Sequence, residues 1–504
     1  MDFSTIGVTL IAFLLTVLLL LVRSWKSKLI YRKLPPGPPA LPFLGNALQI
    51  DKRAPDKCLM KLAKKYGSVF TVWLGPRPAV VLCGYETVKE ALVNQADDFG
   101  ARGTVPSIRK ITNGYGIASS NGHRSLQLRN FAVKTLRHFG RGSKTLESFI
   151  QQEAECLVEV FRRTEGSAFD PTFQLTCATA NIMCAVVFGN RFDYTDKNLL
   201  TLLDMITENM RVISSPWGQL YDLLPSILDR LPGPHNRLFK NAAKIKDFLR
   251  EMIQNHKDAH TKDRPWDFTA SFLAKMEEEE DNPKTEFNDE NLLLSIFNIF
   301  LAGTDTTSST MRWGLLLFLK YPDVQEKIQN EIDEVIGSER TPAMEDREKM
   351  PYTNAAICEI QRYSNIIPLN LPHTVTRDTD FKGFVIPKGM IVIPVLASVL
   401  YDCNCWENPN SFNPDRFLDE EGRFKKNEAF MPFSSGNRMC IGKTVAQMQL
   451  FLFLTTLLQN FTLRSPVEPH TIDISPLSSG FSTLHRPYQL YCVPRKSARH
   501  MASE

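Results

Sequence analysis

The pattern of apolar and polar positions predicts a mainly helical chain with a few short strands. The clearest helix starts at Asn288, whose side chain can cap it, and continues without proline to about Lys320. Pro322 then ends it. At ~1.5 Å per residue this helix would be about 48 Å long. Because it is apolar on most of its faces, we expect it to cross the core of the protein.

Short runs of β-branched and aromatic residues predict the strands. Val69–Leu74 and Ala79–Cys83, separated by the turn residues 75–78, indicate a β-hairpin, and a second strand-like stretch spans Phe384–Ile393. The predicted fold class is therefore mainly α with small β-sheets (α+β). The chain has neither a glycine-rich nucleotide loop nor an internal repeat, so we expect no nicotinamide or flavin site of its own.

The first apolar segment predicts a membrane anchor. Thr5–Val22 has no charge and is just long enough to cross a bilayer as a helix. Basic residues follow it, and such residues collect on the cytoplasmic side of a membrane, so we expect a lumenal N-terminus and a cytosolic main domain. A cleaved signal peptide is the alternative, but the apolar run is longer than a signal-peptide core and no small-residue cleavage site follows.

Prolines separate this anchor from the rest of the chain. Within Leu34–Pro42 they fix φ and prevent the anchor helix from continuing, which predicts a semi-rigid spacer. We therefore divide the chain into an anchor with its basic stop (residues 1–33), a proline-rich hinge (34–45) and one large domain (46–504).

Composition and charge narrow the possible functions. With 504 residues, of which 43% are hydrophobic and 23% charged, the chain has the composition of an ordinary globular protein. A net charge of +4 is too small to favour nucleic acid as a partner. The ten cysteines contain no Cys-x-x-Cys pair and no regular spacing, so they predict neither a disulfide framework nor a zinc site and indicate a reducing compartment.

One of these cysteines is a candidate metal ligand. Cys440 lies behind a glycine-bent loop and ahead of an apolar helical segment, within Phe433–Gly442. A helix that starts near Cys440 directs unpaired N–H groups at the sulfur, which favours a thiolate that can hold an iron. Gly436 permits backbone angles that a side chain would forbid, and Arg438 would reach outward as a fixed cation suited to a carboxylate. The alternative for a single cysteine is burial in an ordinary turn.

The pattern Phe-x-x-Gly-x-Arg-x-Cys-x-Gly in this stretch resembles the haem-thiolate signature of the cytochrome P450 monooxygenases. The resemblance covers essentially the whole chain, and details such as Leu371–His373 and Ala429–Phe433 are similar to the second family of microsomal enzymes, which handle drugs, foreign compounds and some fatty acids or steroids. It implies the cytochrome P450 fold, with a long central helix over a haem b, preceded by a single N-terminal transmembrane helix. It also implies that Cys440 is the axial ligand of the iron.

The middle of the long helix, Ala302–Thr307, resembles the oxygen-activating motif of that family. The resemblance implies that the small residues Ala302 and Gly303 let the haem and dioxygen lie against the backbone. Thr306 would hold water with its hydroxyl group, and Asp305 would relay protons. A polar kink in a core helix is the alternative for this motif taken alone.

Further matches imply structural and haem-binding residues. Glu359 and Arg362 share a helix face and, with Arg416, resemble the ion network that supports the cysteine loop in the family. The alternative is a surface ion pair worth only ~0.5 kcal/mol. For the haem propionates the resemblance implies Arg102, Arg129, His373 and Arg438. Ser125 stands where the family usually has a tryptophan, so one indole donor to a propionate is missing.

The resemblance also implies a substrate wall that is nearly all apolar, with no cation to hold a carboxylate over the iron. Core packing explains any single one of these residues equally well. The candidate wall residues are Val105, Ile108, Tyr115, Asn298, Leu301, Ala302, Ile366, Ile367, Leu369 and Phe481.

Together these features imply a haem-thiolate monooxygenase of the endoplasmic reticulum membrane. It would insert one atom of dioxygen into an apolar small molecule, which could be a xenobiotic, a fatty acid or a steroid. NADPH–cytochrome P450 reductase would supply electrons from NADPH, with cytochrome b5 as a candidate second partner and membrane lipid around the anchor. The reductase would dock on a basic surface formed by Lys443, Lys134, Arg137 and Arg141; a merely solvated basic face is the alternative.

Two other classes of protein stay open at this point. One is a haem-thiolate isomerase or dehydratase that needs no reductase, and the intact pair Asp305 and Thr306 argues against it. The other is a non-catalytic haem-binding or sterol-binding membrane protein, and the complete set of motifs argues against that. Consumption of NADPH in the presence of a reductase would discriminate them.

Overall fold

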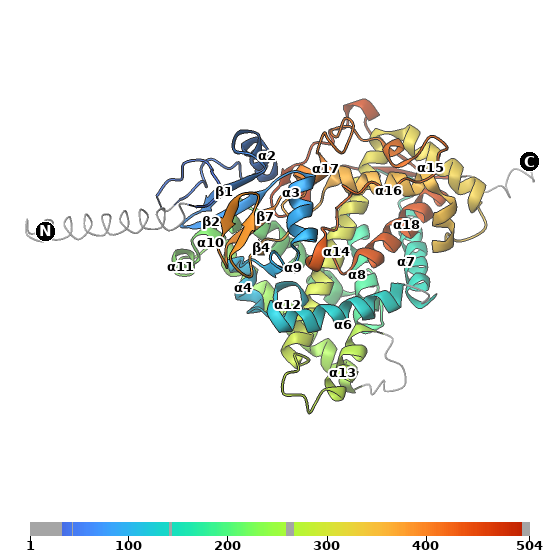
Figure 1. The fold of residues 1–504 in the computed structure, drawn as a ribbon. Helices are drawn as coiled ribbons and strands as arrows, with labels where there is room; N and C mark the ends of the chain where they lie inside the picture. Colours follow the sequence, from blue (N-terminus) through green and yellow to red (C-terminus); the bar gives the residue numbers. More distant parts are fainter. Residues whose placement is uncertain (1–32, 43, 141–143, 259–266, 496–504) are drawn as a thin grey trace, which may run out of the picture.

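The computed structural model describes residues 33–42, 44–140, 144–258 and 267–495. The predicted transmembrane segment Thr5–Val22 lies outside these residues. Among the helices that are described, none is long and apolar enough to span a membrane. Figure 1 shows a small sheet with one helix at one end of the molecule and the bulk of the helices beside it.

Helices make up most of the described chain, as the apolar pattern predicts. The earlier ones are α2 (Pro55–Tyr66), α3 (Tyr85–Lys89), α4 (Pro106–Thr112), α5 (Gly116–Ser119), α6 (Gly122–Gly140), α7 (Lys144–Arg162), α8 (Thr172–Phe188), α9 (Lys197–Ser214), α10 (Pro216–Leu223), α11 (Pro225–Leu228) and α12 (Pro234–Asp258). The later ones are α13 (Phe268–Glu278), α14 (Asp289–Lys320), α15 (Pro322–Val335), α16 (Pro351–Ser364), α17 (Ala397–Leu400) and α18 (Lys443–Asn460). Shorter π and 3-10 turns are η1 (Glu90–Asn94), η2 (Met344–Lys349), η3 (Pro414–Phe417), η4 (Gly436–Arg438) and η5 (Pro469–Thr471).

The strands are short and form small sheets. The largest sheet has the order β1–β2–β7–β4–β3 and contains β1 (Val69–Leu74), β2 (Arg77–Leu82), β7 (Ile391–Pro394), β4 (His373–Thr374) and β3 (Ala101–Arg102). The two-stranded sheets pair β5 (Thr379–Phe381) with β6 (Phe384–Ile386), β8 (Phe461–Arg464) with β11 (Tyr491–Pro494), and β9 (Ser478–Ser479) with β10 (Thr483–Leu484). The predicted fold class, mainly α with small sheets, is confirmed.

The helix α14 is the predicted central helix, and it begins and ends where the sequence predicts. The side chain of Asn288 accepts a hydrogen bond from the N–H of Asn291 (3.0 Å), and α15 starts at Pro322. Its side chains are buried along most of its length, so it crosses the core. In its middle, Thr179 of α8 donates a hydrogen bond to the carbonyl oxygen of Thr304 (3.0 Å). This contact joins α14 to α8 beside the predicted oxygen-activating motif.

Two strand predictions are corrected in detail. The hairpin exists, but β2 starts at Arg77 and pairs with Leu74, so the turn consists of Gly75 and Pro76 alone. The predicted strand Phe384–Ile393 is divided into β6 and β7. Pro387 lacks an N–H for strand pairing and Gly389 adopts a φ of +80°, so the chain turns between the two strands.

Candidate active site

The loop that carries Cys440 is closely held by its neighbours. Gly436 has a φ of +70°, and a Cβ atom at this position would collide with the carbonyl oxygen of Leu92 in η1. Only glycine therefore fits there, as the sequence predicts. The N–H of Cys440 donates to the carbonyl oxygen of Phe433 (2.9 Å) and closes the loop, and α18 begins three residues later.

The surroundings of Cys440 act on its thiol in opposite directions. Its side chain is exposed, yet the protein around it limits hydration of the charged form, and this desolvation raises the pKa of the Cys440 thiol. A hydrogen bond from the N–H of Gly442 lowers the pKa of the thiol again, as do the positive charges of Arg129 and Arg102. The groups that favour a thiolate are thus in place around a thiol that the protein shields from bulk water.

The four residues predicted to bind propionates come together beside this loop. Arg102 and His373 lie opposite each other on β3 and β4, with Nη1 of Arg102 3.1 Å from Nε2 of His373. Arg102 also donates from Nη2 to the carbonyl oxygen of Arg438 (3.4 Å). Arg129 donates from Nη2 to the carbonyl oxygen of Met439 (2.7 Å), immediately before the cysteine.

This cluster has the electrostatics of an anion-binding site. Burial, reinforced by repulsion among the arginines, lowers the pKa of Arg102 to about 9 and that of Arg438 to about 10. Burial and the charge of Arg102 lower the pKa of His373 to about 3, so its ring is neutral. Within the described residues, Nε of Arg102 and Nη1 of Arg438 are buried without a hydrogen-bond partner. Buried donors without partners are costly, and two propionate carboxylates would satisfy them, so the residues present fit a haem b.

Arg438 differs from its prediction in one respect. The sequence predicts a side chain that reaches outward, but Arg438 is buried and lies across the loop. It donates from Nε to the carbonyl oxygen of Gly100 (2.6 Å) and from Nη2 to that of Ser120 (2.9 Å). The cation is therefore fixed, as predicted, but it faces the interior, where a carboxylate has little competition from water.

Glu359 and Arg362 form a buried ion network rather than a surface pair. Both side chains are completely buried, and Arg362 donates from Nε and Nη2 to the two carboxylate oxygens of Glu359 (2.7 and 2.8 Å). Arg416 adds a bond from Nε to Glu359 (3.1 Å). The next residue in η3, Phe417, packs its ring against that of Phe430 (5.2 Å between centroids), shortly before the cysteine loop. The surface alternative is wrong, and the network joins α16 to the segment that leads to the loop.

Thr306 and Asp305 both line a cavity beside α14. The Thr306 hydroxyl donates to the carbonyl oxygen of Ala302 one turn earlier (2.7 Å), which leaves its oxygen free to accept a hydrogen bond. Burial raises the pKa of the Asp305 carboxyl above its ordinary value, opposed by Arg312, whose Nη2 lies 4.0 Å from Oδ1. A carboxyl with a raised pKa takes up and releases protons more readily near neutral pH.

The prediction for Gly303 is wrong. A Cβ atom at position 303 would overlap the sulfur of Met183, so this glycine faces α8 and allows the two helices to approach closely. Ala302, its neighbour, does line the cavity, as predicted. Of Ala302 and Gly303, only Ala302 therefore leaves space over the α14 backbone on the side of the cavity.

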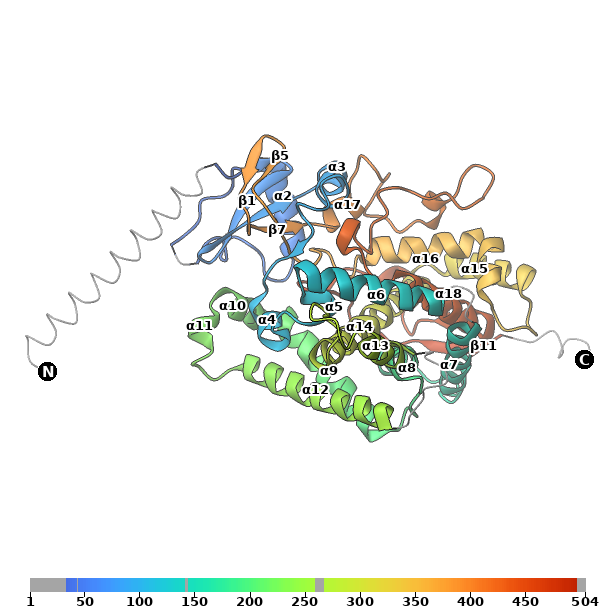
Figure 2. The same ribbon diagram turned by 60° about the horizontal axis from the view of Figure 1, so that its bottom comes forward.

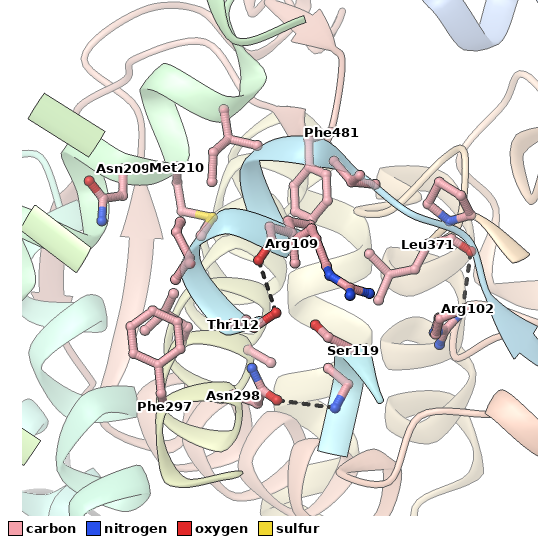
Figure 3. Close-up of a pocket in the computed structure, with 18 of the residues that line it drawn as sticks. Arg102, Arg109, Thr112, Ser119, Asn209, Met210, Phe297, Asn298, Leu371 and Phe481 are labelled. Carbon is pink, nitrogen blue, oxygen red and sulfur yellow. Dashed lines mark hydrogen bonds between the residues drawn. The ribbon is translucent and has the colours of Figure 1, made fainter. Parts of the chain in front are cut away.

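The cavity, including the open space at its mouth, has a volume of about 1310 Å³ (Figure 3). The amide oxygen of Asn298 accepts a hydrogen bond from the N–H of Ala118 (3.1 Å), which fixes its orientation. The predicted wall residues that line this cavity are Val105, Ile108, Asn298, Leu301, Ala302 and Phe481, and those that do not are Tyr115, Ile366, Ile367 and Leu369.

Several lining residues were missed by sequence reasoning. Among them are Phe297, Met210 and Asn209, whose Oδ1 is buried without a hydrogen-bond partner in the described residues. Arg109 also lines the cavity, so the lining includes a cation that the candidate wall lacked. The available signal was its position, because Arg109 follows the predicted wall residue Val105 by four residues in a helix and must lie on the same face.

Ser125 leads to the first prediction. It is buried on α6, one helical turn before Arg129, and therefore faces the cysteine loop. A Ser125→Trp variant should slow haem loss up to about tenfold, because an indole N–H can reach a propionate and a hydrogen bond is worth ~0.5–1.5 kcal/mol. The measurement is the rate of haem transfer to an apo-globin.

The matched control is Leu126→Trp on the same helix, since Leu126 is 61% exposed and points away from the loop. It should leave the transfer rate unchanged. Equal or faster haem transfer from the Ser125→Trp protein would contradict the prediction.

A cysteine that faces a backbone N–H and arginine charges, beside buried arginines with unpaired donors, is the arrangement that a haem-thiolate protein requires. Comparison with known proteins identifies the family. The family model for cytochrome P450 matches residues 35–492, so the chain belongs to the cytochrome P450 family.

The curated relatives are similar over nearly their whole length. The chain is 48% identical to cytochrome P450 2C55 of Rattus norvegicus over 95% of this chain and 97% of the relative. It is 49% identical to cytochrome P450 2F2 of Mus musculus, covering 91% and 93%, and 48% identical to cytochrome P450 2C8 of Homo sapiens, covering 94% and 97%. The chain is accordingly a haem-thiolate monooxygenase with haem b as cofactor, which uses a redox partner and acts on hydrophobic small molecules.

Proposed function

We propose that Cys440 ligates the haem iron, that Arg102, Arg129, His373 and Arg438 hold its propionates, and that Thr306 and Asp305 deliver protons during monooxygenation. The observation that carries this proposal is the cluster of buried arginines with unpaired donors beside Cys440. When bound, the haem supplies the iron at which dioxygen is activated. Glu359, Arg362 and Arg416 act structurally, by fixing the segment that leads to the cysteine loop.

Proton delivery follows from the side chains on α14. The oxygen of Thr306 can accept a hydrogen bond from a water molecule in the cavity, because its own proton is donated to Ala302. Asp305, with its raised pKa, can pass protons to that water, since its side chain lines the same cavity. The apolar walls formed by Leu301, Phe297 and Phe481 exclude bulk water and hold an apolar substrate.

The decisive experiment is turnover by the purified enzyme with NADPH and reductase on a panel of fatty acids, steroids and drug-like amines. Product that requires NADPH, reductase and dioxygen supports a monooxygenase. Product without reductase would instead support the isomerase or dehydratase alternative, against which the Asp305 and Thr306 pair in the cavity argues. Haem binding without any turnover would support a non-catalytic protein.

We also propose that the chain resides in the endoplasmic reticulum membrane, with the N-terminus lumenal and the domain from residue 46 onward cytosolic. The support is the charge pattern of the sequence, an uncharged segment Thr5–Val22 followed by basic residues. Its relatives are similar over most of their length, which supports the same division into an anchor, a hinge and one catalytic domain.

The electron donor is proposed to be NADPH–cytochrome P450 reductase, with cytochrome b5 as a second partner, on a basic surface near the thiolate. Lys134 and Arg137 are exposed on α6, which lies next to α18 (Figure 2). Lys443 begins α18, where desolvation and the nearby charge of Lys426 lower its pKa, so cations crowd this face. Arg141, the remaining predicted member, lies outside the described residues.

This surface gives the second prediction. Arg137→Glu combined with Lys443→Glu should raise the reductase concentration needed for half-maximal turnover by about tenfold, because charge steering accelerates association. Raising salt shortens the Debye length from ~8 Å to ~3 Å and should weaken the wild-type interaction in the same way.

Peroxide-driven oxidation, which bypasses the reductase, should be unchanged in this variant. The matched control is Lys64→Glu, an exposed cation on α2 beside the small sheet. If the variant lost equal activity in the reductase and peroxide assays, the substitutions would have damaged the haem site itself, and this result would contradict the docking hypothesis.

A further inference from the structure

Arg109 gives the substrate cavity a positive charge. Val105, the residue before α4, precedes Arg109 by four positions and Thr112 follows it by three, and all of them line the cavity. Figure 3 shows the Arg109 side chain directed into the cavity. The adjacent cation, Lys110, points the other way, where it pairs with Asp229 (2.6 Å) and covers the ring of Phe239 (4.3 Å).

The guanidinium of Arg109 has no partner in the described part of the chain. Neither a carboxylate nor another acceptor bonds to it there, although nearby cations are paired: Lys110 with Asp229, and Arg124 with Glu286 (2.7 Å). An arginine that lines an apolar cavity while its donors stay unused can bind an anion that enters the cavity.

We propose that the cavity takes amphipathic carboxylic acids, with the carboxylate on Arg109 and the apolar part extending toward Ala302; this inference rests on the proposed function. The planar fork of one guanidinium matches the two coplanar oxygens and single charge of a carboxylate. Arg109 is itself exposed, so the charged head stays partly hydrated while the chain enters the apolar interior past Ile108 and Leu301.

The charge also distinguishes acids from neutral compounds of the same shape. A carboxylic acid and its methyl ester bury the same apolar chain, so both should enter the cavity. Only the acid forms the charge-assisted pair, and because Arg109 is exposed we expect the low end of the range for such bonds. The preference for the acid should therefore depend on Arg109 and on ionic strength, whereas binding of the ester should depend on neither.

The test measures dissociation constants of dodecanoate and methyl dodecanoate with the holoenzyme, by calorimetry and by the haem spin-state shift. Arg109→Met should weaken dodecanoate binding about tenfold, equivalent to about 1.4 kcal/mol, and the ester less than about twofold. Arg109→Lys should restore part of the loss, since it keeps the charge without the fork. Lys110→Met, the neighbouring cation that faces away, should change neither constant.

Two outcomes would overturn the inference. One is an unchanged ratio of the acid and ester constants in Arg109→Met; the other is an equal loss for both ligands, which would mean that Arg109 acts through packing. Failure of the proposed function looks different, because dodecanoate would then bind with the predicted dependence on Arg109 but yield no product with NADPH and reductase.

Discussion

Replacing Cys440 by serine should abolish the absorption near 450 nm that a ferrous haem with a thiolate ligand shows with carbon monoxide. The N–H of Gly442 and the charges of Arg129 and Arg102 favour a thiolate at this position. A serine hydroxyl is far less acidic, so the same surroundings cannot ionise it, and it donates little electron density to an iron. Product formation with NADPH and reductase should fall to background.

The Cys440→Ser protein should still take up haem. Arg102, Arg129 and Arg438 lie outside the substituted side chain, and their unpaired donors remain available for the propionates. A spectrum with haem present and the 450 nm band absent would therefore separate ligation from binding. Cys403→Ser, at an exposed cysteine, is the control and should leave the spectrum unchanged. Persistence of the band in Cys440→Ser would show that another residue is the ligand.

Local features were the most predictable from the sequence. The start of α14 depends on its cap Asn288, its end depends on Pro322 at the start of α15, and the bend at Gly436 depends on the backbone angle of that glycine. Each of these needs only neighbours in the sequence. Burial of the pair Glu359 and Arg362 could not be predicted in this way, because an i,i+3 spacing is equally compatible with a surface and with a core.

Convergence of distant segments could not be derived from local pattern. Arg102, Arg129, His373 and Arg438 lie on separate elements, and only the resemblance to a family placed them together. For the same reason Gly303 was assigned to the wrong partner. A glycine in a buried helix lets another element approach closely on the side where other residues carry a Cβ atom. The sequence cannot show that Met183 of α8 occupies that side of Gly303.

Arg109 was missed for another reason. The candidate wall followed from the resemblance to a family, which did not point to position 109. The spacing from Val105 to Arg109 predicts a shared face, which the cavity confirms. Periodicity was therefore more informative than the resemblance at this position, and it is the cation that gives the cavity a chemical preference.

The second large effect is expected at Thr306. Thr306→Ala should reduce the product formed per NADPH consumed by about tenfold or more, with hydrogen peroxide released instead, because the water that delivers protons loses its acceptor on α14. The rate of NADPH consumption should change much less. The substitution should not destabilise the helix, because alanine has the higher helix propensity and the lost hydroxyl bond is internal to one turn.

Two variants make this prediction specific. Thr306→Ser keeps a hydroxyl at the same place and should retain most of the coupling, whereas Thr306→Val keeps the shape without the hydroxyl and should behave like alanine. Thr310→Ala removes an equivalent hydroxyl one turn later, which donates to the carbonyl oxygen of Thr306 (2.8 Å) and does not line the cavity, so coupling should persist. If Thr306→Ala kept the wild-type ratio of product to NADPH, or if Thr310→Ala lost it equally, proton delivery would have to follow a route that does not involve the Thr306 hydroxyl.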